Sequence, residues 1–452
     1  MTISGQLVGE SCWSCAASEA ARPVREPAGS VPRVLGQACR GARSAGPPRR
    51  EGTQAMTRSL SRRSVQPPMR VPAGHRARPW RWVVPVGVVA LTMLAMPGVP
   101  AAASRDRGHS ADFRQINLVS DVPGAARLTD PDLVNAWGMA ASPGTNQQPG
   151  SPLWVSDNGT DKTTLYAGAT ATSVTKAGLV VNIASGAPTG QVFNIDQSGF
   201  MIHDGNGHSG PAIFIFDSEN GGIDAWNPAV GATGASPSTV TETPVTNGAN
   251  AVYKGLATGV ASNGHTYLYA ANFRSGRVEA YDSTFTPVEL PGGLFVDPRI
   301  PAGYAPFNVQ ELLGKLYVSY AKQDATLHDD VAGSGHGFVD VFTNDGALVK
   351  RLVTRGALNS PWGLATAPAG FGRFGGALLV GNFGDGRINA YNPHSGAHLG
   401  QLRKENGRPI VVDGLWGLRF GNGNAAKSGE LLFSAGPNGE SHGLLGKIAP
   451  IR

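Results

Sequence analysis

Pro361-Trp362-Gly363-Leu364-Ala365 is the clearest copy of a short segment that occurs six times, at intervals of about 52 to 65 residues. Each copy precedes short runs of β-branched and aromatic residues that end in Gly, Asn, Asp or Pro, the composition of strands and turns. One such small sheet cannot bury both of its faces alone. The period therefore predicts an all-β fold, a six-bladed β-propeller of four-stranded blades. The other five copies are Trp137-Gly138-Met139-Ala140, Gly190-Gln191-Val192-Phe193, Gly255-Leu256-Ala257, Pro306-Phe307-Asn308-Val309 and Trp416-Gly417-Leu418.

The two ends of the repeat region complement each other. The last repeat stops after its third strand, residues 443–448, while an extra strand, residues 115–119, precedes the first repeat. We expect strand 115–119 to complete the last blade, because this closes the ring and removes an exposed sheet edge. Residues 104–452 are therefore predicted to form one propeller.

The segment before the propeller has the pattern of an export signal. Residues 83–96 form an apolar run that follows several arginines and precedes Ala101-Ala102-Ala103, which predicts a signal peptide over 56–103 and cleavage after Ala103. A membrane helix needs about 20 apolar residues, more than this run has, although an uncleaved anchor stays an alternative. Residues 1–55 are a low-complexity extension, expected to lie upstream of the true start. We predict an exported protein, periplasmic or extracellular, with no stable membrane anchor.

Charge and cysteine content exclude several classes of function. Of the chain's 38 bases and 32 acids, 14 Arg and four Glu lie in residues 1–103, which leaves 24 bases against 28 acids in the propeller. This mild acidity argues against nucleic acid as a partner. All three cysteines, Cys12, Cys15 and Cys39, also lie before residue 104, so the propeller has no thiolate chemistry and no disulfide. A small molecule or an extracytoplasmic protein is the expected partner, and a monomer is the expected state.

One loop departs from the repeat. In a propeller, the loops between the second and third strands emerge on one face, and five of them are short here. The fourth spans residues 321–336 and contains Asp324, His328, Asp329 and Asp330. Carboxylates and imidazoles are ligands of Ca²⁺, Mg²⁺ or Zn²⁺, so this loop is a candidate metal or catalytic site. A solvated loop or a lid over the channel is the alternative, because the spacing matches no metal motif.

Several segments support a resemblance to a known family: Asn135-Ala136-Trp137-Gly138, Pro188-Thr189-Gly190-Gln191-Val192-Phe193-Asn194, Tyr320-Ala321-Lys322-Gln323-Asp324, His328-Asp329-Asp330-Val331-Ala332-Gly333 and Ser360-Pro361-Trp362-Gly363-Leu364. On these segments, residues 113–450 resemble an uncharacterised family of secreted bacterial propellers, similar in architecture to NHL-repeat and gluconolactonase-like propellers. The resemblance implies the fold and export, and it brings no established activity.

Gluconolactonase-like propellers hold a divalent cation at the channel mouth with Glu, Asn and Asp, where it polarises a carbonyl or activates water. Analogous positions here are Asn135, Asp157, Asn272, Asp324 and Asn382. Turn-capping by Asn and Asp explains the same residues without a ligand. The expected Glu has no counterpart at the starts of the inner strands, which carry Asn135, Lys254, Asn308, Ser360 and Asp413.

The sequence thus predicts a propeller that binds an unknown ligand or protein on the loop face at the channel mouth. A metal-dependent hydrolase or lyase at that mouth is the alternative. The predicted ligand-binding residues are Asn135, Lys254, Asn272 and Asn382, and the predicted metal ligands are Asp157, Asp324, His328, Asp329 and Asp330. Lys254 either offers a cation to an anionic ligand or is a solvated lysine on the rim. His203-Asp204-Gly205-Asn206-Gly207-His208 is expected to be a glycine-rich turn on the opposite face.

Overall fold

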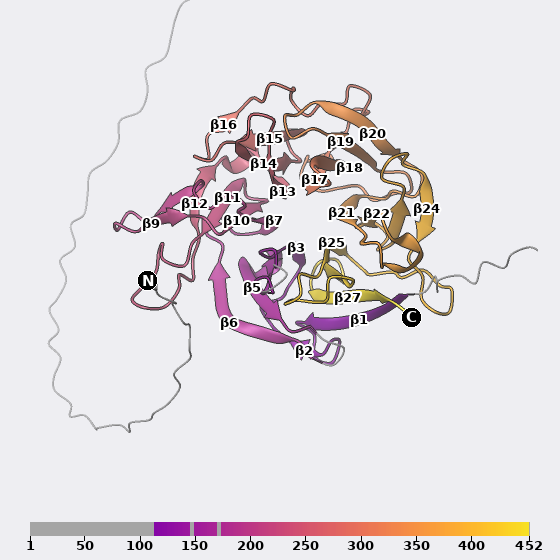
Figure 1. Ribbon diagram of the computed structural model, residues 1–452, viewed down its shortest axis with the longest axis horizontal. Helices are drawn as coiled ribbons and strands as arrows, with labels where there is room; N and C mark the ends of the chain where they lie inside the picture. The colour runs from indigo at the N-terminus through magenta and orange to yellow at the C-terminus, as the bar shows by residue number, and fades with distance from the viewer. Residues whose placement is uncertain (1–112, 145–148, 170–172, 452) are drawn as a thin grey trace, which may run out of the picture. The chain divides into compact units, whose positions relative to one another are not determined.

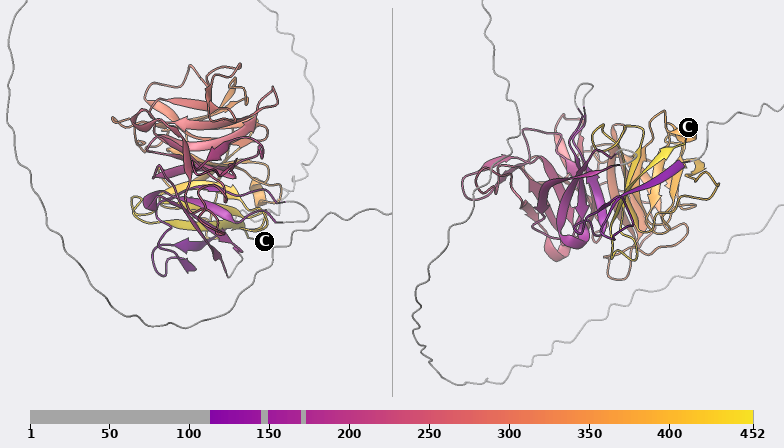
Figure 2. Two further views of the ribbon diagram at one scale, coloured as in Figure 1. Left: turned by 90° about the vertical axis from the view of Figure 1, so that its left-hand side faces the viewer. Right: turned by 90° about the horizontal axis from the view of Figure 1, so that it is seen from below.

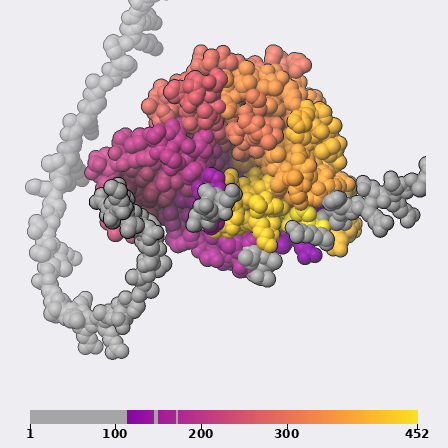
Figure 3. Space-filling model, in the orientation of Figure 1, coloured from indigo at the N-terminus to yellow at the C-terminus, as the bar shows by residue number. Residues whose placement is uncertain are grey.

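Six small, mainly antiparallel sheets follow one another around a central axis (Figure 1). This is a computed structural model that describes residues 113–144, 149–169 and 173–451. The extension 1–55 and the signal peptide 56–103 lie outside these residues and stay predictions. The all-β, six-bladed propeller predicted from the repeat is confirmed. Figure 2 shows it from the edge, and the space-filling view in Figure 3 shows the blades following the chain order around the ring.

Every blade has the same strand order, from an inner strand A at the axis to an outer strand D. The A strands are β3 (Ala136–Ala140), β7 (Pro188–Phe193), β13 (Tyr253–Val260), β17 (Tyr304–Leu312), β21 (Pro361–Thr366) and β25 (Leu415–Phe420). The B strands are β4 (Leu153–Asp157), β10 (Phe214–Ser218), β14 (Thr266–Asn272), β18 (Lys315–Lys322), β22 (Leu378–Asn382) and β26 (Leu431–Ala435).

The outer half of each blade is more variable in length. The C strands are β5 (Lys162–Ala167), β11 (Gly222–Trp226), β15 (Arg277–Tyr281), β19 (Phe338–Phe342), β23 (Ile388–Tyr391) and β27 (Leu444–Pro450). The D strands are β6 (Thr175–Asn182), β12 (Glu242–Thr246), β16 (Pro287–Val288), β20 (Leu348–Thr354), β24 (His398–Gln401) and β1 (Phe113–Ser120). The remaining elements are β2 (Leu128–Thr129), β8 (Met201–His203), β9 (Ser209–Pro211) and the 3-10 turns η1 (Asn158–Thr160), η2 (Gly248–Asn250) and η3 (Gly372–Phe374).

Strand β1 closes the ring, as predicted. It pairs antiparallel with β27 from Phe113 opposite Pro450 to Ser120 opposite Leu444, with one bulge between Asn117 and Val119. Figure 1 shows the indigo β1 beside the yellow β27. The C-terminal blade thereby gains an outer strand from the N-terminal end of the propeller, and β27 is no longer an open edge.

The glycines of the repeated segment let neighbouring blades touch at the axis. A Cβ on Gly138 would lie 2.4 Å from the Thr189 carbonyl oxygen of the next blade, and one on Gly417 would lie 2.7 Å from the Trp137 carbonyl oxygen. Real Cβ atoms do not approach this closely, so the A strands pack at this distance only because glycine lacks the atom. The repeat therefore marks contacts between blades, as its period suggested.

The two faces of the propeller are fixed by strand register. Ala136 lies opposite Asp157, Tyr253 opposite Asn272, and Pro361 opposite Asn382, so A strands begin where B strands end. We call the face at this end the B–C face, because the loops from B to C emerge there. The other is the A–B face, and the hairpin of β8 and β9 that contains the predicted glycine-rich turn is an A–B insertion. None of the helices in the described residues is long and apolar enough to span a membrane.

Candidate functional site

Charged and amide side chains from five blades meet around the axis on the B–C face. We call this group the mouth cluster. Lys254 follows the first residue of β13, and the other members come from the residue before β3 and from B–C loops. Its members are Asn135, Asn158, Glu219, Lys254, His328, Asp329 and Glu440.

Lys254 lies at the centre of the mouth cluster and is only 2% exposed. Its Nζ donates hydrogen bonds to Glu219 Oε1 and, at 3.3 Å, to Asp329 Oδ1. Burial acts to lower the pKa of Lys254, but the carboxylates of Glu219 and Asp329 together outweigh burial and raise that pKa above its ordinary value. The interpretation of Lys254 as a solvated rim lysine is therefore wrong, because loops of the two flanking blades bury it.

Glu219 links the lysine to the amides of the first blade. Its Oε2 accepts a hydrogen bond from Asn158 Nδ2 at 2.9 Å, and Asn158 Oδ1 accepts one from Asn135 Nδ2 at 3.0 Å. Asn135 Nδ2 also donates to Glu440 Oε2 at 2.8 Å, and burial raises the pKa of Glu440. Glu219 and Glu440 are the two glutamates that sequence reasoning missed. A search for glutamates in the B–C loops, rather than at the starts of the A strands, would have found both.

The long loop of the fourth blade contains four predicted metal ligands, and two of them, His328 and Asp329, belong to the mouth cluster. His328 Nδ1 lies 2.8 Å from Asp329 Oδ1. Burial acts to raise the pKa of Asp329, but Lys254 and His328 hold it below its ordinary value, so this carboxylate stays ionised. One ligand atom each from Glu219, His328 and Asp329 lie within 4.8 Å of one another. We call these three residues the mouth triad.

The other predicted metal ligands lie outside the triad. Asp324 accepts hydrogen bonds from Thr326 and from the backbone N–H of His328, so its carboxylate caps the loop's own turn. Asp330 is partly buried, and this burial raises the pKa of its carboxyl. Asp157 is fully buried at the end of β4, and burial raises its pKa well above the ordinary range, which favours the neutral acid over a metal ligand.

Asn272 and Asn382 make bonds within their own blades. Asn272 Nδ2 donates to Glu279 Oε1 at 2.7 Å, and Asn382 Nδ2 donates to the Ala357 carbonyl oxygen at 2.8 Å. Both are buried at the ends of B strands, as the turn-capping interpretation expects. Of the four predicted ligand-binding residues, the structure brings together Asn135 and Lys254.

An aromatic floor lies under the mouth cluster. Trp137 stacks on Trp416 with ring centroids 3.4 Å apart. Phe383 also stacks on Trp416, with ring centroids 3.9 Å apart. The Lys254 ammonium lies 5.2 Å from the centroid of Trp137, a cation–π distance. Trp362 Nε1 donates to the Lys254 carbonyl oxygen at 2.7 Å, whereas Trp137 Nε1 has no acceptor among the described residues. The floor therefore supports Lys254 through a cation–π contact with its ammonium and a hydrogen bond to its backbone.

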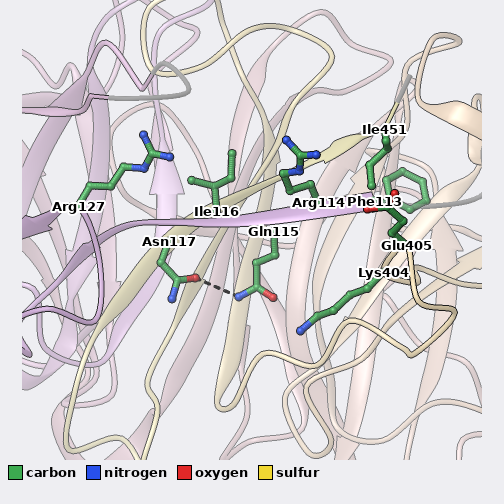
Figure 4. A pocket seen from close by; sticks show the side chains of 9 residues that line it. All are labelled: Phe113, Arg114, Gln115, Ile116, Asn117, Arg127, Lys404, Glu405 and Ile451. Atoms are coloured by element: carbon green, nitrogen blue, oxygen red, sulfur yellow. Dashed lines mark hydrogen bonds between the residues drawn. The ribbon is translucent and has the colours of Figure 1, made fainter.

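A hollow of about 590 Å³ lies elsewhere, along strand β1 at the outer edge of the ring. Gln115 and Asn117 project from one side of the strand, joined by a 3.1 Å hydrogen bond, and Arg114 projects from the other (Figure 4). Arg127 and Lys404 also line this hollow, but Figure 4 shows their charged ends pointing in different directions. Because no polar groups converge there, the mouth cluster is the better candidate site.

No protein-family model matches the chain. An uncharacterised protein of Acanthamoeba polyphaga mimivirus is 33% identical over 339 residues, which cover 73% of this chain and 78% of the relative. A second uncharacterised protein of the same virus is 34% identical over 342 residues, covering 73% of this chain and 84% of the relative. The chain belongs to the family of these mimivirus proteins. These relatives are viral, so the bacterial origin that the resemblance suggested is not supported.

Solved structures add neighbours of the propeller fold. A gluconolactonase from Xanthomonas campestris is 16% identical, covers 58% of this chain and 80% of its own, and gives a TM-score of 0.36. A protein of unknown function from Bacteroides thetaiotaomicron is 11% identical, covers 75% of both chains, and gives a TM-score of 0.45. Likeness at this level says nothing about activity, which has to be argued from the mouth cluster.

Proposed function

We propose that this protein is a binding propeller that holds a divalent cation at the mouth triad and recognises its ligand through that cation. The observation that carries the proposal is the convergence of Glu219, His328 and Asp329, whose ligand atoms lie within 4.8 Å of one another. They come from B–C loops of the second and fourth blades, so the packing of blades around the axis brings them together. The longest of the B–C loops, that of the fourth blade, supplies two of the three.

The charges around the triad support a cation. Three carboxylates, from Glu219, Asp329 and Glu440, face one ammonium, from Lys254, so the cluster keeps negative charge. One imidazole and two carboxylates form a donor set that suits Zn²⁺ better than Ca²⁺ or Mg²⁺, which prefer oxygen alone. Zn²⁺ with three protein ligands also keeps a coordination position open for a ligand. Zn²⁺ is therefore the ion that we expect.

Lys254 competes with such an ion. Its ammonium already pairs with Glu219 and Asp329, so a bound cation would take over these carboxylates and would lie close to the lysine's own charge. Replacing Lys254 by an uncharged side chain of similar length should therefore tighten metal binding. If the cluster is only a structural ion-pair network, replacing Lys254 should destabilise the fold and should not tighten metal binding.

Calorimetric titration of the full chain with Zn²⁺ tests this proposal. We expect one ion per chain, tighter binding by Lys254→Met, and no binding by the double variant Glu219→Gln, Asp329→Asn. Asp324→Asn is the matched control, because its carboxylate lies in the same loop but bonds only that loop's own groups. If neither the unaltered protein nor Lys254→Met binds a stoichiometric ion, the cluster is an ion-pair network and the proposal fails.

The hydrolase or lyase alternative depends on the same ion. A cation at the triad would polarise a carbonyl at its open position. Hydrolysis of a simple lactone by the zinc-loaded protein, lost in the double variant and kept in Asp324→Asn, would favour the enzyme over the binding protein. Zinc binding without such turnover favours the binding protein.

We also propose that the protein is exported and acts as a monomer on a small molecule or an extracytoplasmic protein. Support for export comes from the apolar run 83–96 and the alanines at 101–103, which lie outside the described residues. N-terminal sequencing of protein recovered outside the cytoplasm tests this: a start at residue 104 supports the proposal, and a start at or before residue 56 contradicts it.

A further inference from the structure

Strand β1 leaves most of its outer edge without a partner. On its inner side it pairs with β27, whereas on its outer side β2 pairs only with Val119 and Ser120. Residues 113–117 therefore have no neighbouring strand on the outer side among the described residues. The hollow of about 590 Å³ follows this stretch, since all five residues line it. We call residues 113–117 and the hollow beside them the β1 edge.

Backbone hydrogen-bonding groups point out of the β1 edge. Successive residues of an antiparallel strand direct these groups alternately to one side and to the other. The Ile116 carbonyl oxygen faces β27, because a Cβ on Gly446 of that strand would lie 2.9 Å from it. Gln115 and Asn117 are therefore directed outward. The Phe113 N–H follows the same alternation, since it donates at 2.8 Å to a carbonyl oxygen in the loop after β24.

The β1 edge is long enough to pair with a short extended peptide. At about 3.4 Å per residue, its five residues span about 17 Å. A peptide that lies in the hollow can exchange backbone hydrogen bonds with Gln115 and Asn117 and so add a strand to the C-terminal blade. In such strand addition the backbone bonds give affinity, and contacts to alternate side chains give selectivity.

Basic side chains flank the β1 edge. Arg114 belongs to β1, Arg127 directly precedes β2, and Lys404 lies in the loop after β24. All three line the hollow and are exposed, and none has an ion-pair partner among the described residues. Figure 4 shows the two guanidinium groups on one side of β1 and the Lys404 ammonium on the other. Glu405 is the one carboxylate among the described lining residues, so the hollow keeps positive charge.

This charge distinguishes among the possible occupants of the β1 edge. A second copy of the chain would place its own basic residues against these, and like charges on paired strands are destabilising. The segment 104–112 before β1 contains two arginines and two aspartates, so it brings no net negative charge. An acidic segment of another protein would neutralise the cations on both sides of the strand.

We propose that the β1 edge binds an acidic segment of a partner protein in extended conformation, as an added outer strand of the C-terminal blade. The segment's backbone pairs with Gln115 and Asn117, and its carboxylates contact Arg114, Arg127 and Lys404. The proposal does not rest on the cation at the mouth triad, because β1 lies at the outside of the ring and the triad lies at its axis (Figure 1).

Three fluorescent seven-residue peptides separate backbone pairing from charge in anisotropy titrations of the full chain at about 0.15 M salt. The first alternates Glu and Thr, the second is the same peptide N-methylated at every residue, and the third has Lys in place of Glu. We expect the first to bind at least about fivefold more tightly than either of the others. The arginines before residue 104 attract the two acidic peptides alike, so a difference between these two reports backbone pairing.

Two results with the peptides would overturn the proposal. Equal binding of the acidic peptide and its N-methylated form would show attraction by charge without strand addition. The absence of saturable binding of the acidic peptide at millimolar concentrations would show that the edge takes no such strand.

Variants test the assigned side chains. The double variant Arg114→Gln, Arg127→Gln should weaken binding of the acidic peptide at least about tenfold. Its matched control is Arg277→Gln, Arg355→Gln, which removes the same charge from exposed positions on the third and fourth blades and should leave binding unchanged. Unchanged binding by the first variant, or an equal loss in the control, contradicts the proposal.

The backbone of β1 can be tested separately. Gln115→Pro removes an outward N–H that β27 does not use, so it should abolish peptide binding with little change in melting temperature. If this variant does not fold, the N-methylated peptide still tests the pairing. Dimers of the unaltered chain that Gln115→Pro abolishes would assign the edge to a second copy and contradict the proposal. Asp329→Asn should bind the peptide normally and lose the metal, so failures of the two proposals can be told apart.

Discussion

Lys254 Nζ lies 3.3 Å from Asp329 Oδ1, which ties the inner strand of the third blade to the long loop of the fourth. The same loop is held at two further places. Gln323 Nε2 donates to the Phe273 carbonyl oxygen at 2.6 Å, and the Gly333 N–H donates to Asn359 Oδ1 at 2.6 Å. The loop is thus bonded to the third and fifth blades, and it forms a fixed wall of the mouth rather than a freely solvated segment.

The two carboxylates around Lys254 should differ in their contribution to stability. The Glu219 side chain is 15% exposed and that of Asp329 is 67% exposed. Glu219→Gln leaves a buried ammonium short of its closer partner and should lower the free energy of unfolding by about 1–3 kcal/mol. Asp329→Asn removes a mostly solvated charge and should lower it by less than about 1 kcal/mol. Urea unfolding measures both, and an equal loss would contradict this arrangement.

Adding a methyl group at the axis should force neighbouring blades apart. The new Cβ in Gly138→Ala would meet Thr189 O at 2.4 Å, a backbone atom that cannot rotate away, so we expect a loss of about 1–3 kcal/mol in unfolding free energy. Gly178→Ala is the control, because nothing lies within 4 Å of a Cβ at that position of β6. It should be neutral or slightly stabilising. A tolerated Gly138→Ala would show that the A strands do not pack this closely.

The sequence predicted the fold because each blade repeats the same local chemistry. Strand composition, turn residues and the close-packing glycines all occur within one repeat, so they can be recognised without knowing which blades are neighbours. The closing strand was predictable for a related reason. The last repeat lacks one strand and the N-terminal region has one to spare, and an unpaired edge is unfavourable.

The candidate sites were harder to predict because they depend on contacts between blades. Lys254 meets residues 35 and 75 positions away, and nothing near Lys254 in the sequence signals that it is buried. Loop length alone revealed the segment that contains His328 and Asp329.

Loss of the closing strand should open the ring. Without residues 113–120, the edge of β27 and the apolar residues that pack against Phe113, among them Phe371 and Phe374, would be exposed. We expect protein that begins at residue 121 to aggregate and to melt at a lower temperature than protein that begins at residue 104. A synthetic peptide of residues 113–120 should restore solubility in part, whereas a scrambled peptide should not. Equal melting of the two proteins would contradict closure by β1.

Asp217 should make stability fall as pH rises. The residue is fully buried, and burial raises its pKa to about 7 even though Thr189 Oγ1 and the Gly190 N–H donate to its carboxylate. The folded state therefore holds a proton that the unfolded chain releases near pH 4. A raised folded pKa gives stability that is fully present below about pH 4 and is lost as pH rises through about pH 7.

Melting temperature measured from pH 4 to pH 8 tests this sign. Asp217→Asn keeps the acceptor oxygen and cannot ionise, so the melting temperature of the variant should rise relative to the unaltered protein as pH increases across this range. Burial also raises the pKa of Asp340 to about 7, so the melting temperature of that variant should still fall somewhat as pH rises. The melting temperature of the double variant Asp217→Asn, Asp340→Asn should therefore depend even less on pH. A single variant that follows the unaltered protein in parallel at every pH would show that Asp217 is not protonated in the folded state.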